Sequence, residues 1–336
     1  MRMRIAVVAA AGLLAAGCGS PFGGQSLPST SQLVNGAADG FAKATSLEVS
    51  GTFTEASASY TVDIQFAPPS TAHLTVTQNN KLRFEGLAVN GKIFFRGRDF
   101  IALLLGSGTS DQQLAKAVGD RWFTSSAPKD VIPLDVSPFT DASKVKANFL
   151  TTLPAKRKDN VTSSGVMTAE LTTDDYIVNI TEASPYRLVS LRTAQGKTVQ
   201  QLTDATLAYS NFNKDFAIQT PTDVVDKDNH STWPPMYTRV SIEHSGCNDP
   251  CTLSAVYRND GGTTGASAPS TVNFTLTSKA DGSALGSCKA TIQPDVANGQ
   301  TVTESCSISS SAWTAFNSVN GNVYIYNAVV DNPAYD

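Results

Sequence analysis

The spacing of hydrophobic and polar positions changes early in the chain. Between residues 32 and 44 the apolar side chains recur at helical spacing, directly after a run of serine and threonine suited to capping a helix. From residue 47 onward apolar and polar residues alternate, which is the period of a strand with one buried face. The alternating segments are residues 47–53, 60–66, 74–76, 82–84 and 93–95. Asn90-Gly91 precedes the last of them and is a strong hairpin signal, so we expect a helix followed by an antiparallel meander.

Further helices and strands follow the meander. Ser110 and Gln113 have the spacing of a capping box, and Gly119 is suited to end the helix that they begin. A third helix is expected over residues 141–153, and strand patterns resume at 161–171, 176–181, 187–193 and 199–209. About ten strands and three helices then form one α+β domain over residues 32–220. Its antiparallel sheet has one face that the helices must cover.

The remainder of the chain has a different pattern. Residues 221–237 combine three prolines with several charges and no periodicity, which predicts a linker. Residues 238–336 then contain six or seven short strand patterns separated by Gly and Asn turns. These patterns are at 240–244, 252–258, 272–277, 287–292, 302–308 and 322–329. Such regular short strands are typical of a β-sandwich of the immunoglobulin-like type.

Four of the five cysteines lie in this second domain. We favour a Cys247–Cys251 disulfide across a tight hairpin turn, and a Cys288–Cys306 disulfide between neighbouring strands, among three connectivities. A zinc site is the alternative, with His244 supplying the fourth ligand. Structural zinc usually takes two closely spaced cysteine pairs, and only one exists here, so we predict no metal.

The fifth cysteine, Cys18, follows an N-terminal segment with two arginines and an apolar run of about a dozen residues. That run is too short for a membrane span, which needs about 20 residues. The residues Leu14 to Cys18 (LAAGC) resemble a bacterial lipobox, in which the cysteine thiol receives a diacylglyceryl group. We therefore expect a lipoprotein signal peptide over residues 1–17 and a flexible tether over 18–31. The alternative is an unmodified cysteine in an ordinary signal peptide.

Charge is unevenly distributed between the two domains. The net charge of the chain is −4, and residues 237–336 contain four Lys/Arg against eight Asp/Glu. An acidic second domain and a near-neutral first one argue against a nucleic-acid partner. The expected location is the extracytoplasmic side of the cell membrane, with the acylated Cys18 as the membrane attachment.

The sequence lacks a recognisable catalytic constellation. The three histidines, His73, His230 and His244, fall in no metalloprotease motif, and there is no G-x-S-x-G segment. Ser143 and Lys146 match S-x-x-K, but its partner motifs are missing, and the lysine is better explained by the solvated face of a helix. We predict neither an enzyme nor a cofactor.

Several stretches of the first domain resemble a known family. These are SLEVSGTF, NGKIFFRGRDFIALLLG followed by VGDRWF, and GKTVQQLTDATLAYSNFNKDFAIQTP. With the lipobox and tether before them, they resemble the actinobacterial lipoproteins LppX and LprG over residues 32–225. That family is similar to the LolA lipoprotein carriers. The resemblance implies an open antiparallel half-barrel covered by helices around a lipid cavity.

Two hypotheses of function follow. In the first, the protein is a membrane-anchored lipoprotein that binds or transfers acylated lipids or glycolipids in an apolar cavity of the first domain, with an envelope protein as partner of the second. In the alternative, it is a non-enzymatic envelope sensor or scaffold with a solid core that binds protein partners. Periodicity does not separate a core from a cavity. The cavity candidates are Phe53, Val62, Ile64, Phe66, Leu74, Val76, Phe84, Phe95, Val145, Phe149 and Leu153.

Overall fold

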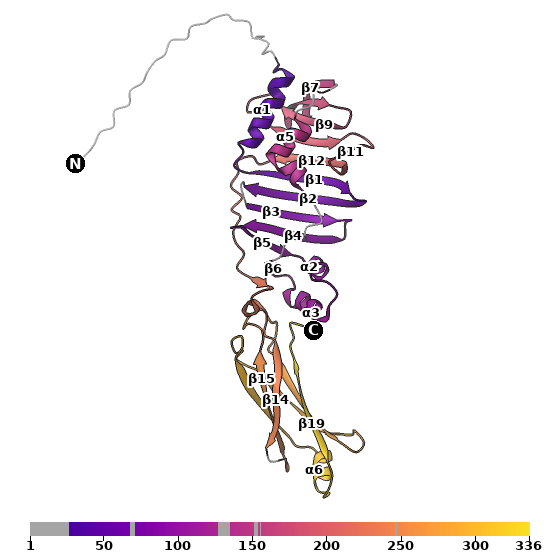
Figure 1. Cartoon of the computed structure of the whole chain (residues 1–336), viewed down its shortest axis with the longest axis vertical. Helices are drawn as coiled ribbons and strands as arrows, with labels where there is room; N and C mark the ends of the chain where they lie inside the picture. The colour runs from indigo at the N-terminus through magenta and orange to yellow at the C-terminus, as the bar shows by residue number, and fades with distance from the viewer. Residues whose placement is uncertain (1–26, 68–70, 127–134, 151–153, 155, 246) are drawn as a thin grey trace, which may run out of the picture.

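The computed structural model describes residues 27–336 except 68–70, 127–134, 151–153, 155 and 246. Cys18 and Leu153 therefore lie outside the described residues. So do the predicted signal peptide and residues 18–26 of the predicted tether, whereas its last two residues, Thr30 and Ser31, belong to the first helix and are therefore not tether. Two modules follow one another along the long axis of the molecule (Figure 1). The first contains a long sheet with helices, and the second is built almost entirely of strands.

One sheet of 13 strands forms the first module. Its path runs β13-β6-β5-β4-β3-β2-β1-β12-β10-β9-β8-β7, and β11 pairs with β12 beside this path. All pairs are antiparallel except β13 with β6. Through residue 210 the strands are β1 (Leu47–Glu55), β2 (Ala58–Ala67), β3 (Thr71–Gln78), β4 (Leu82–Val89), β5 (Lys92–Arg96), β6 (Trp122–Thr124), β7 (Lys156–Ser163), β8 (Val166–Thr172), β9 (Tyr176–Thr181), β10 (Leu188–Thr193), β11 (Thr198–Val199) and β12 (Leu202–Ser210).

The predicted meander is confirmed, and two later strand predictions are wrong, since the expected strand over residues 199–209 is the β11–β12 hairpin with its turn at Gln200-Gln201. Asn90 and Gly91 have φ of 52° and 73°, as a two-residue hairpin turn between β4 and β5 requires. The expected single strand over residues 161–171 is instead the β7–β8 hairpin. Ser164-Gly165 turns the chain there, with φ of 48° and 77°. This turn interrupts an alternation that appeared continuous in the sequence.

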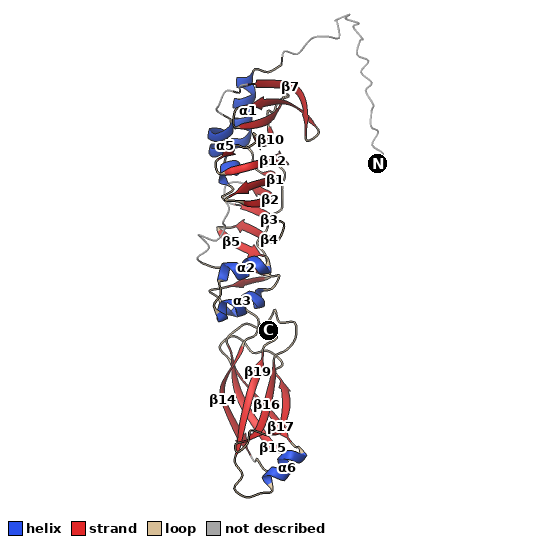
Figure 2. Cartoon of the chain, turned by 90° about the vertical axis from the view of Figure 1, so that its right-hand side faces the viewer, coloured by secondary structure: helices blue, strands red, loops and turns tan. Residues whose placement is uncertain are grey.

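Five helices accompany the sheet in the described residues, and in Figure 2 α1 and α5 lie along one side of the sheet while α2 and α3 lie near β5. They are α1 (Thr30–Ala42), α2 (Arg98–Leu105), α3 (Thr109–Val118), α4 (Ser137–Thr140) and α5 (Ala142–Phe149). Ser29 caps α1 in a full capping box, and its partner is Gln32. The predicted start of α3 at Ser110 is wrong, because the helix begins after Gly108, although it ends at Gly119 as expected.

The remaining helices differ from the prediction in extent or in presence. The predicted third helix begins after Asp141 but ends at Phe149. Helices α2 and α4 were not predicted. The α2 segment has apolar residues on all sides, with Phe100 and Ile101 buried and Leu103 exposed, so no helical stripe marks it.

The segment predicted as a linker contributes to the first sheet. Strand β13 (Val224–Asp226) pairs in parallel with β6, and the 3₁₀ turn η1 (His230–Thr232) follows it. Val224 packs with Leu87, Phe94 and Trp122 on the outer face of the sheet. A short parallel edge strand leaves no alternation to recognise, because it has only three residues.

The second module contains two three-stranded antiparallel sheets, ordered β14-β15-β18 and β17-β16-β19. Their strands are β14 (Tyr237–Ser245), β15 (Cys251–Asn259), β16 (Thr271–Ser278), β17 (Ala284–Thr291), β18 (Thr301–Ile308) and β19 (Tyr324–Asp331). The helix α6 (Ser311–Asn317) was not predicted, and it buries Trp313 completely. The immunoglobulin-like assignment stays a prediction.

Both disulfides have the favoured pairing. Cys247–Cys251 closes the β14–β15 turn. Cys288–Cys306 joins β17 to β18, which belong to different sheets, so this bond links the two sheets and not neighbours within one. The four sulfurs are therefore not available as zinc ligands. Among the described residues there is also no cluster of three or more His, Cys, Asp or Glu side chains placed to hold a metal ion.

The two modules contact each other through Arg121. Its Nε donates to Asp223 Oδ1 at 2.6 Å, and its Nη2 donates to the carbonyl oxygen of Thr232 at 3.2 Å. Gly265 of the second module lies so close that a Cβ there would be 2.5 Å from Arg121 Nη1. Near the C-terminus Tyr335 is buried and donates from its hydroxyl to a backbone carbonyl of the connecting segment at 3.0 Å, and burial raises its pKa.

Candidate lipid-binding grooves

An apolar groove of about 560 Å³ opens between the inner face of the sheet and helices α1, α4 and α5. This volume lies within the range of about 300–1,000 Å³ that is common for small-ligand sites. Strands β2, β3 and β4 form the floor. The lining residues are Phe41, Ala42, Ala44, Ile64, Phe66, Thr71, Ala72, Ala88, Val136, Ser137, Thr140, Asp141 and Ala142.

Side-chain size along one cross-strand row explains why space is left here. Phe66 is opposite Ala72 in the β2–β3 register, and Ala72 is opposite Ala88 in the β3–β4 register. The three side chains share the inner face, because directly opposed residues of an antiparallel pair point to the same side. In the next row Ile64 is opposite Leu74, and Leu74 is opposite Gly86, where the side chains of Leu74 and Phe95 occupy the space above the glycine. The two alanines therefore leave a depression that neighbouring rows do not have.

Most of the predicted cavity residues lie in the packed core beside the groove. Ile64 and Phe66 line the groove itself. The others that the structure describes are buried in the same hydrophobic cluster. They are Phe53, Val62, Leu74, Val76, Phe84, Phe95, Val145 and Phe149. Their part in binding a lipid stays a prediction.

Aromatic contacts show how closely this core is filled. Phe84 stacks on Phe100 of α2 with ring centroids 4.1 Å apart, and Phe149 meets Tyr176 edge-to-face at 5.4 Å. The hydroxyl of Tyr209 is buried and donates to the carbonyl oxygen of Phe139 at 3.1 Å, and burial raises the pKa of Tyr209. The open space beside this core is the groove above Ala72 and Ala88, which the helices do not cover.

Some groove residues carried a signal in the sequence and others did not. Phe41 and Ala44 belong to the apolar side of the predicted first helix, and Ala72 and Ala88 occupy the inner positions of strands. The sequence pattern did not predict that the small side chains of Ala72 and Ala88 would leave a groove on the inner face of the sheet. Val136 lies beside α4, which has only four residues and no periodicity to detect.

Polar groups at the rim of the groove belong to the start of α5. Asp141 caps this helix, because its Oδ1 accepts from the backbone N–H of Ser143 at 2.9 Å and of Lys144 at 3.0 Å. The hydroxyl of Ser143 also donates to Asp141. These hydrogen bonds, with that of the Ser143 hydroxyl first, lower the pKa of Asp141. The rim thus carries a carboxylate whose pKa lies below the ordinary value.

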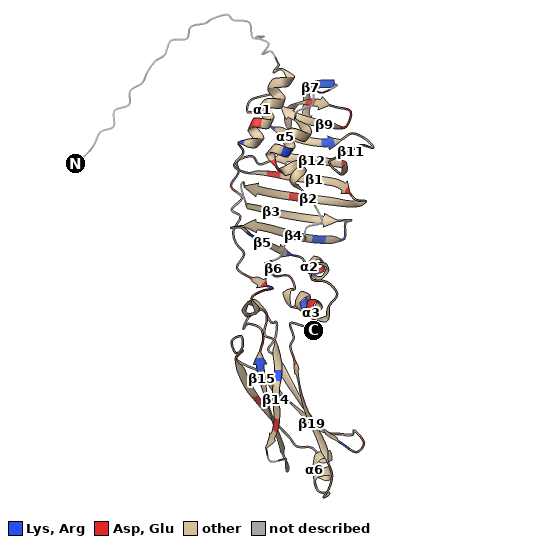
Figure 3. Ribbon diagram, viewed as in Figure 1, with Lys and Arg blue, Asp and Glu red and all other residues tan. Residues whose placement is uncertain are grey.

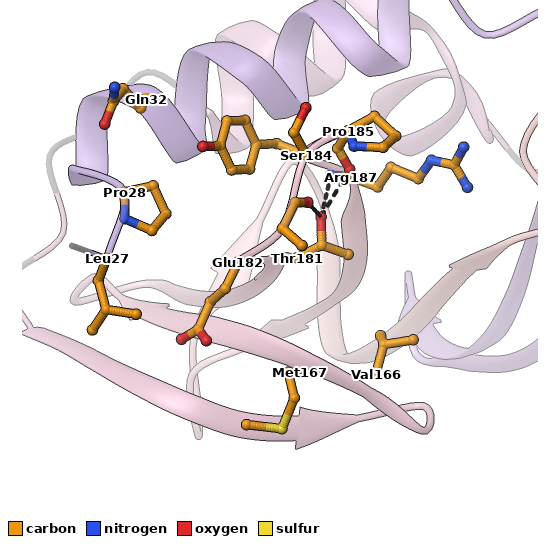
Figure 4. Close-up of a pocket in the computed structure, with 12 residues that line it drawn as sticks. Leu27, Pro28, Gln32, Val166, Met167, Thr181, Glu182, Ser184, Pro185 and Arg187 are labelled. Carbon is orange, nitrogen blue, oxygen red and sulfur yellow. Dashed lines mark hydrogen bonds between the residues drawn. The ribbon is translucent and has the colours of Figure 1, made fainter. Parts of the chain in front are cut away.

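A second groove, of about 980 Å³, lies at the β7 end of the module. Figure 4 shows Leu27 and Pro28 on one side of it and Val166 and Met167 of β8 on the other, with Glu182 between them. The ring of Tyr186 packs directly against α1. This contact needs Gly36, where a Cβ would be 2.4 Å from Tyr186 Cδ2.

Comparisons with solved structures find distant similarities. The crystal structure of LprF from Mycobacterium bovis is 14% identical with a TM-score of 0.38, covering 58% of this chain and 99% of that one. A structure of MucB in complex with MucA(peri) is 11% identical, and a MucA/MucB complex from Pseudomonas aeruginosa is 12% identical. Both have a TM-score of 0.27 and cover 82% of this chain and 92% of the other.

These similarities are too distant to carry an argument about function. No protein-family model matches the chain, and no curated protein matches it. The resemblance to LppX and LprG stays a prediction from the sequence.

Proposed function

We propose that this chain is a non-enzymatic lipoprotein of the bacterial cell envelope, held at the membrane by an acylated Cys18, which binds an acyl chain of an envelope lipid in the groove between the sheet and α1, α4 and α5. The single observation that carries the proposal is this groove, with apolar walls and an open side next to a well-packed core. Burial of apolar surface would drive binding, at about 0.8 kcal/mol per CH₂ removed from water.

The arrangement of the rim also suits an amphipathic ligand. Phe41 and Phe66 stand within the groove, whereas Ser137, Thr140 and Asp141 lie where α4 meets α5. An acyl chain would lie along the alanine row, and its polar end would remain near these hydroxyl groups. Lys144 donates from its Nζ to the hydroxyl of Ser137 beside Asp141, so the rim offers one charge of each sign together with hydroxyl groups, which suits a polar head group.

Native mass spectrometry tests the proposal directly. Residues 19–336 would be expressed in a lipid-containing host, which removes the anchor and keeps every described residue. We expect a purified fraction that carries the extra mass of a lipid, and we expect Phe66→Asp to lose this mass while remaining folded by circular dichroism. Protein that carries no lipid and takes up none when mixed with lipid extracts would contradict the proposal.

A second candidate function, that of a scaffold binding a protein partner, has one observation in its favour. The second module exposes apolar side chains at Ile325 and Val329 of β19 and at Val323 just before it, and β19 is an edge strand that pairs only with β16 in the described part of the chain. An envelope protein could add an extended apolar segment to this edge. Proximity labelling from the second module in cells, compared between the wild type and Ile325→Lys, tests this function. An unchanged set of labelled proteins would contradict it.

A further inference from the structure

The end of the first module that carries β7 exposes a cluster of apolar side chains. Leu27, Val166 and Met167 are 50%, 43% and 49% exposed. Leu103, at 71%, is the only other large hydrophobic side chain exposed in the described residues of this module. Three of the four therefore line one groove (Figure 4). A cluster of this kind marks an interaction surface more often than scattered single residues do.

Positive charge lies on the neighbouring strand, at the other end of the β7–β8 hairpin from Val166 and Met167. Strand β7 is the last strand of the sheet and begins with Lys156, Arg157 and Lys158 (Figure 3). Arg157 pairs with Asp159 at 2.6 Å and donates to Thr30 Oγ1 at 3.2 Å, which ties β7 to the start of α1. Lys156 and Lys158 are exposed, so this end presents two lysines in a chain of net charge −4.

The other charged groups at this end are engaged within the protein. Glu182, which lies in the groove, accepts from the backbone N–H of Asn160 at 2.6 Å. The guanidinium of Arg187 lies 5.3 Å from the centre of the Phe212 ring. Glu170 is opposite Lys158 in the β7–β8 register and forms an ion pair with Arg192 at 3.0 Å. Because these groups are paired within the protein, the two lysines set the sign of the charge that this surface offers to a partner.

The position of the N-terminus decides which partner this surface can meet. Leu27 lines the groove and is nine residues after Cys18 in the sequence. Even a fully extended chain of that length spans at most about 32 Å. An acylated Cys18 would thus hold this end within about 32 Å of the bilayer, whereas the second module lies at the opposite end of the molecule (Figure 1).

We propose that the β7 end of the first module lies on the anionic lipid surface in which the Cys18 anchor is inserted. Leu27, Val166 and Met167 would enter the boundary between head groups and acyl chains, while Lys156 and Lys158 contact anionic head groups. Interfacial binding strengthens with apolar burial and with electrostatic attraction to anionic lipid, and this end offers both. The proposal rests on the predicted anchor and does not depend on a lipid bound in the groove near Ala88.

Vesicle binding of the anchor-free chain, residues 19–336, tests the apolar contribution. Wild-type protein should sediment with vesicles of phosphatidylcholine and phosphatidylglycerol. Val166→Asp combined with Met167→Asp should weaken this binding at least about tenfold. Leu103→Asp is the matched control, since it also replaces an exposed apolar residue, and it should bind like the wild type. Equal losses in the control and in the double variant would overturn the proposal.

Charge reversal tests the electrostatic contribution. Each lysine near an anionic surface contributes about fivefold in binding, so Lys156→Glu with Lys158→Glu should weaken binding at least about 25-fold. Lysines on an edge strand also prevent pairing with other sheets. If that is their only role, this variant would bind vesicles like the wild type, which would overturn the charge contact.

Attachment through Cys18 detects contacts too weak for the anchor-free chain. The other four cysteines are held in disulfides, so a maleimide lipid can be coupled to the Cys18 thiol of residues 18–336. Tethering raises the effective concentration to about the millimolar range. Hydrogen exchange at the β7–β8 turn should then be slower on anionic vesicles than in solution, and exchange at the Asp281-Gly282 turn should not change. Equal exchange at the β7–β8 turn in both conditions would refute the proposal, even where native mass spectrometry finds a bound lipid.

Discussion

Filling the alanine row of the groove should separate a lipid-binding site from an incidental depression. Ala88 lies on the inner face of β4, opposite Ala72, and lines the groove. Replacing Ala88 with leucine adds three carbon atoms to a space that an acyl chain would otherwise occupy. The core positions Leu74 and Phe84 keep their side chains, so the substitution acts on the groove and leaves the packed cluster intact.

The size of the effect follows from the number of atoms displaced. If the leucine excludes about three methylene groups of the ligand, binding loses about 2.4 kcal/mol at about 0.8 kcal/mol each, which is about a 50-fold rise in Kd. The lipid-free protein should not lose stability, because the added side chain is itself removed from water against Phe66 and Ala72. We expect its free energy of unfolding to rise by between zero and about 2 kcal/mol.

The assay is titration with a fluorescent unbranched fatty acid, together with urea unfolding of the lipid-free protein. Thr75→Leu is the control, because Thr75 lies on the outer face of β3, where an added apolar side chain does not reach the groove. Unchanged affinity of the Ala88→Leu variant would refute the groove as the binding site. Equal losses in the Ala88 and Thr75 variants would refute the reasoning from the cross-strand row. If Ala88→Leu fails to fold, Ala72→Val tests the same row with a smaller addition.

Three further predictions concern stability. Gly40→Ala should cost about 1–2 kcal/mol in urea unfolding despite the better helix propensity of alanine, because a Cβ there would be 2.8 Å from the backbone oxygen of Tyr186; alanine at an exposed position of the same helix should cost nothing. Because the folded-state pKa of Asp141 is lowered, its contribution is complete above the ordinary value of 3.8 and is lost as the pH falls through the lower, folded-state pKa. Asp141→Asn should therefore be less stable than the wild type at pH 7 and lose less stability between about pH 4 and 2, so that the two proteins converge in acid; the same loss in both proteins would contradict the assignment. Cys288→Ala with Cys306→Ala should lower the free energy of unfolding of the second module by about 3 kcal/mol, followed by the fluorescence of the tryptophan in α6, and should leave the first module unchanged.

The candidate groove could be predicted only in part. Alternation placed Ile64 and Phe66 on the inner face, and the structure confirms that they lie there. The empty space beside them depends on Ala72 and Ala88 being adjacent across two strand pairs, which is a matter of register. Register is set by the turns and by the buried face together, so it is not contained in either strand alone.

At the β7 end of the first module, too, the sequence shows the residues but not their arrangement. The basic run at residues 156–158 is visible in the sequence, but its place on the last strand of the sheet is not. The hairpin turn at Ser164-Gly165 brings Val166 and Met167 to that end. No local pattern brings Leu27 to them, because contact between the N-terminus and β8 arises only when α1 packs on the sheet.

Features that depend on residues close together in the chain could be predicted from the sequence. The alternation of the meander, the turn at Asn90-Gly91, the cap at Ser29 and the tight Cys247–Cys251 pair each depend on residues a few positions apart, and each is present in the structure. The sequence by itself thus determined these strands, turns and caps, but not the cap of α3 or the turn at Ser164-Gly165.

Only the tertiary structure showed how these elements pair and pack against one another. It added β13 to the first sheet, linked the two sheets of the second module through Cys288, and packed most of the inner-face side chains into a core that leaves one groove open. The physical reason is that removing apolar side chains from water is favourable whether they then contact each other or a ligand. Only the distances between whole elements determine how much space remains.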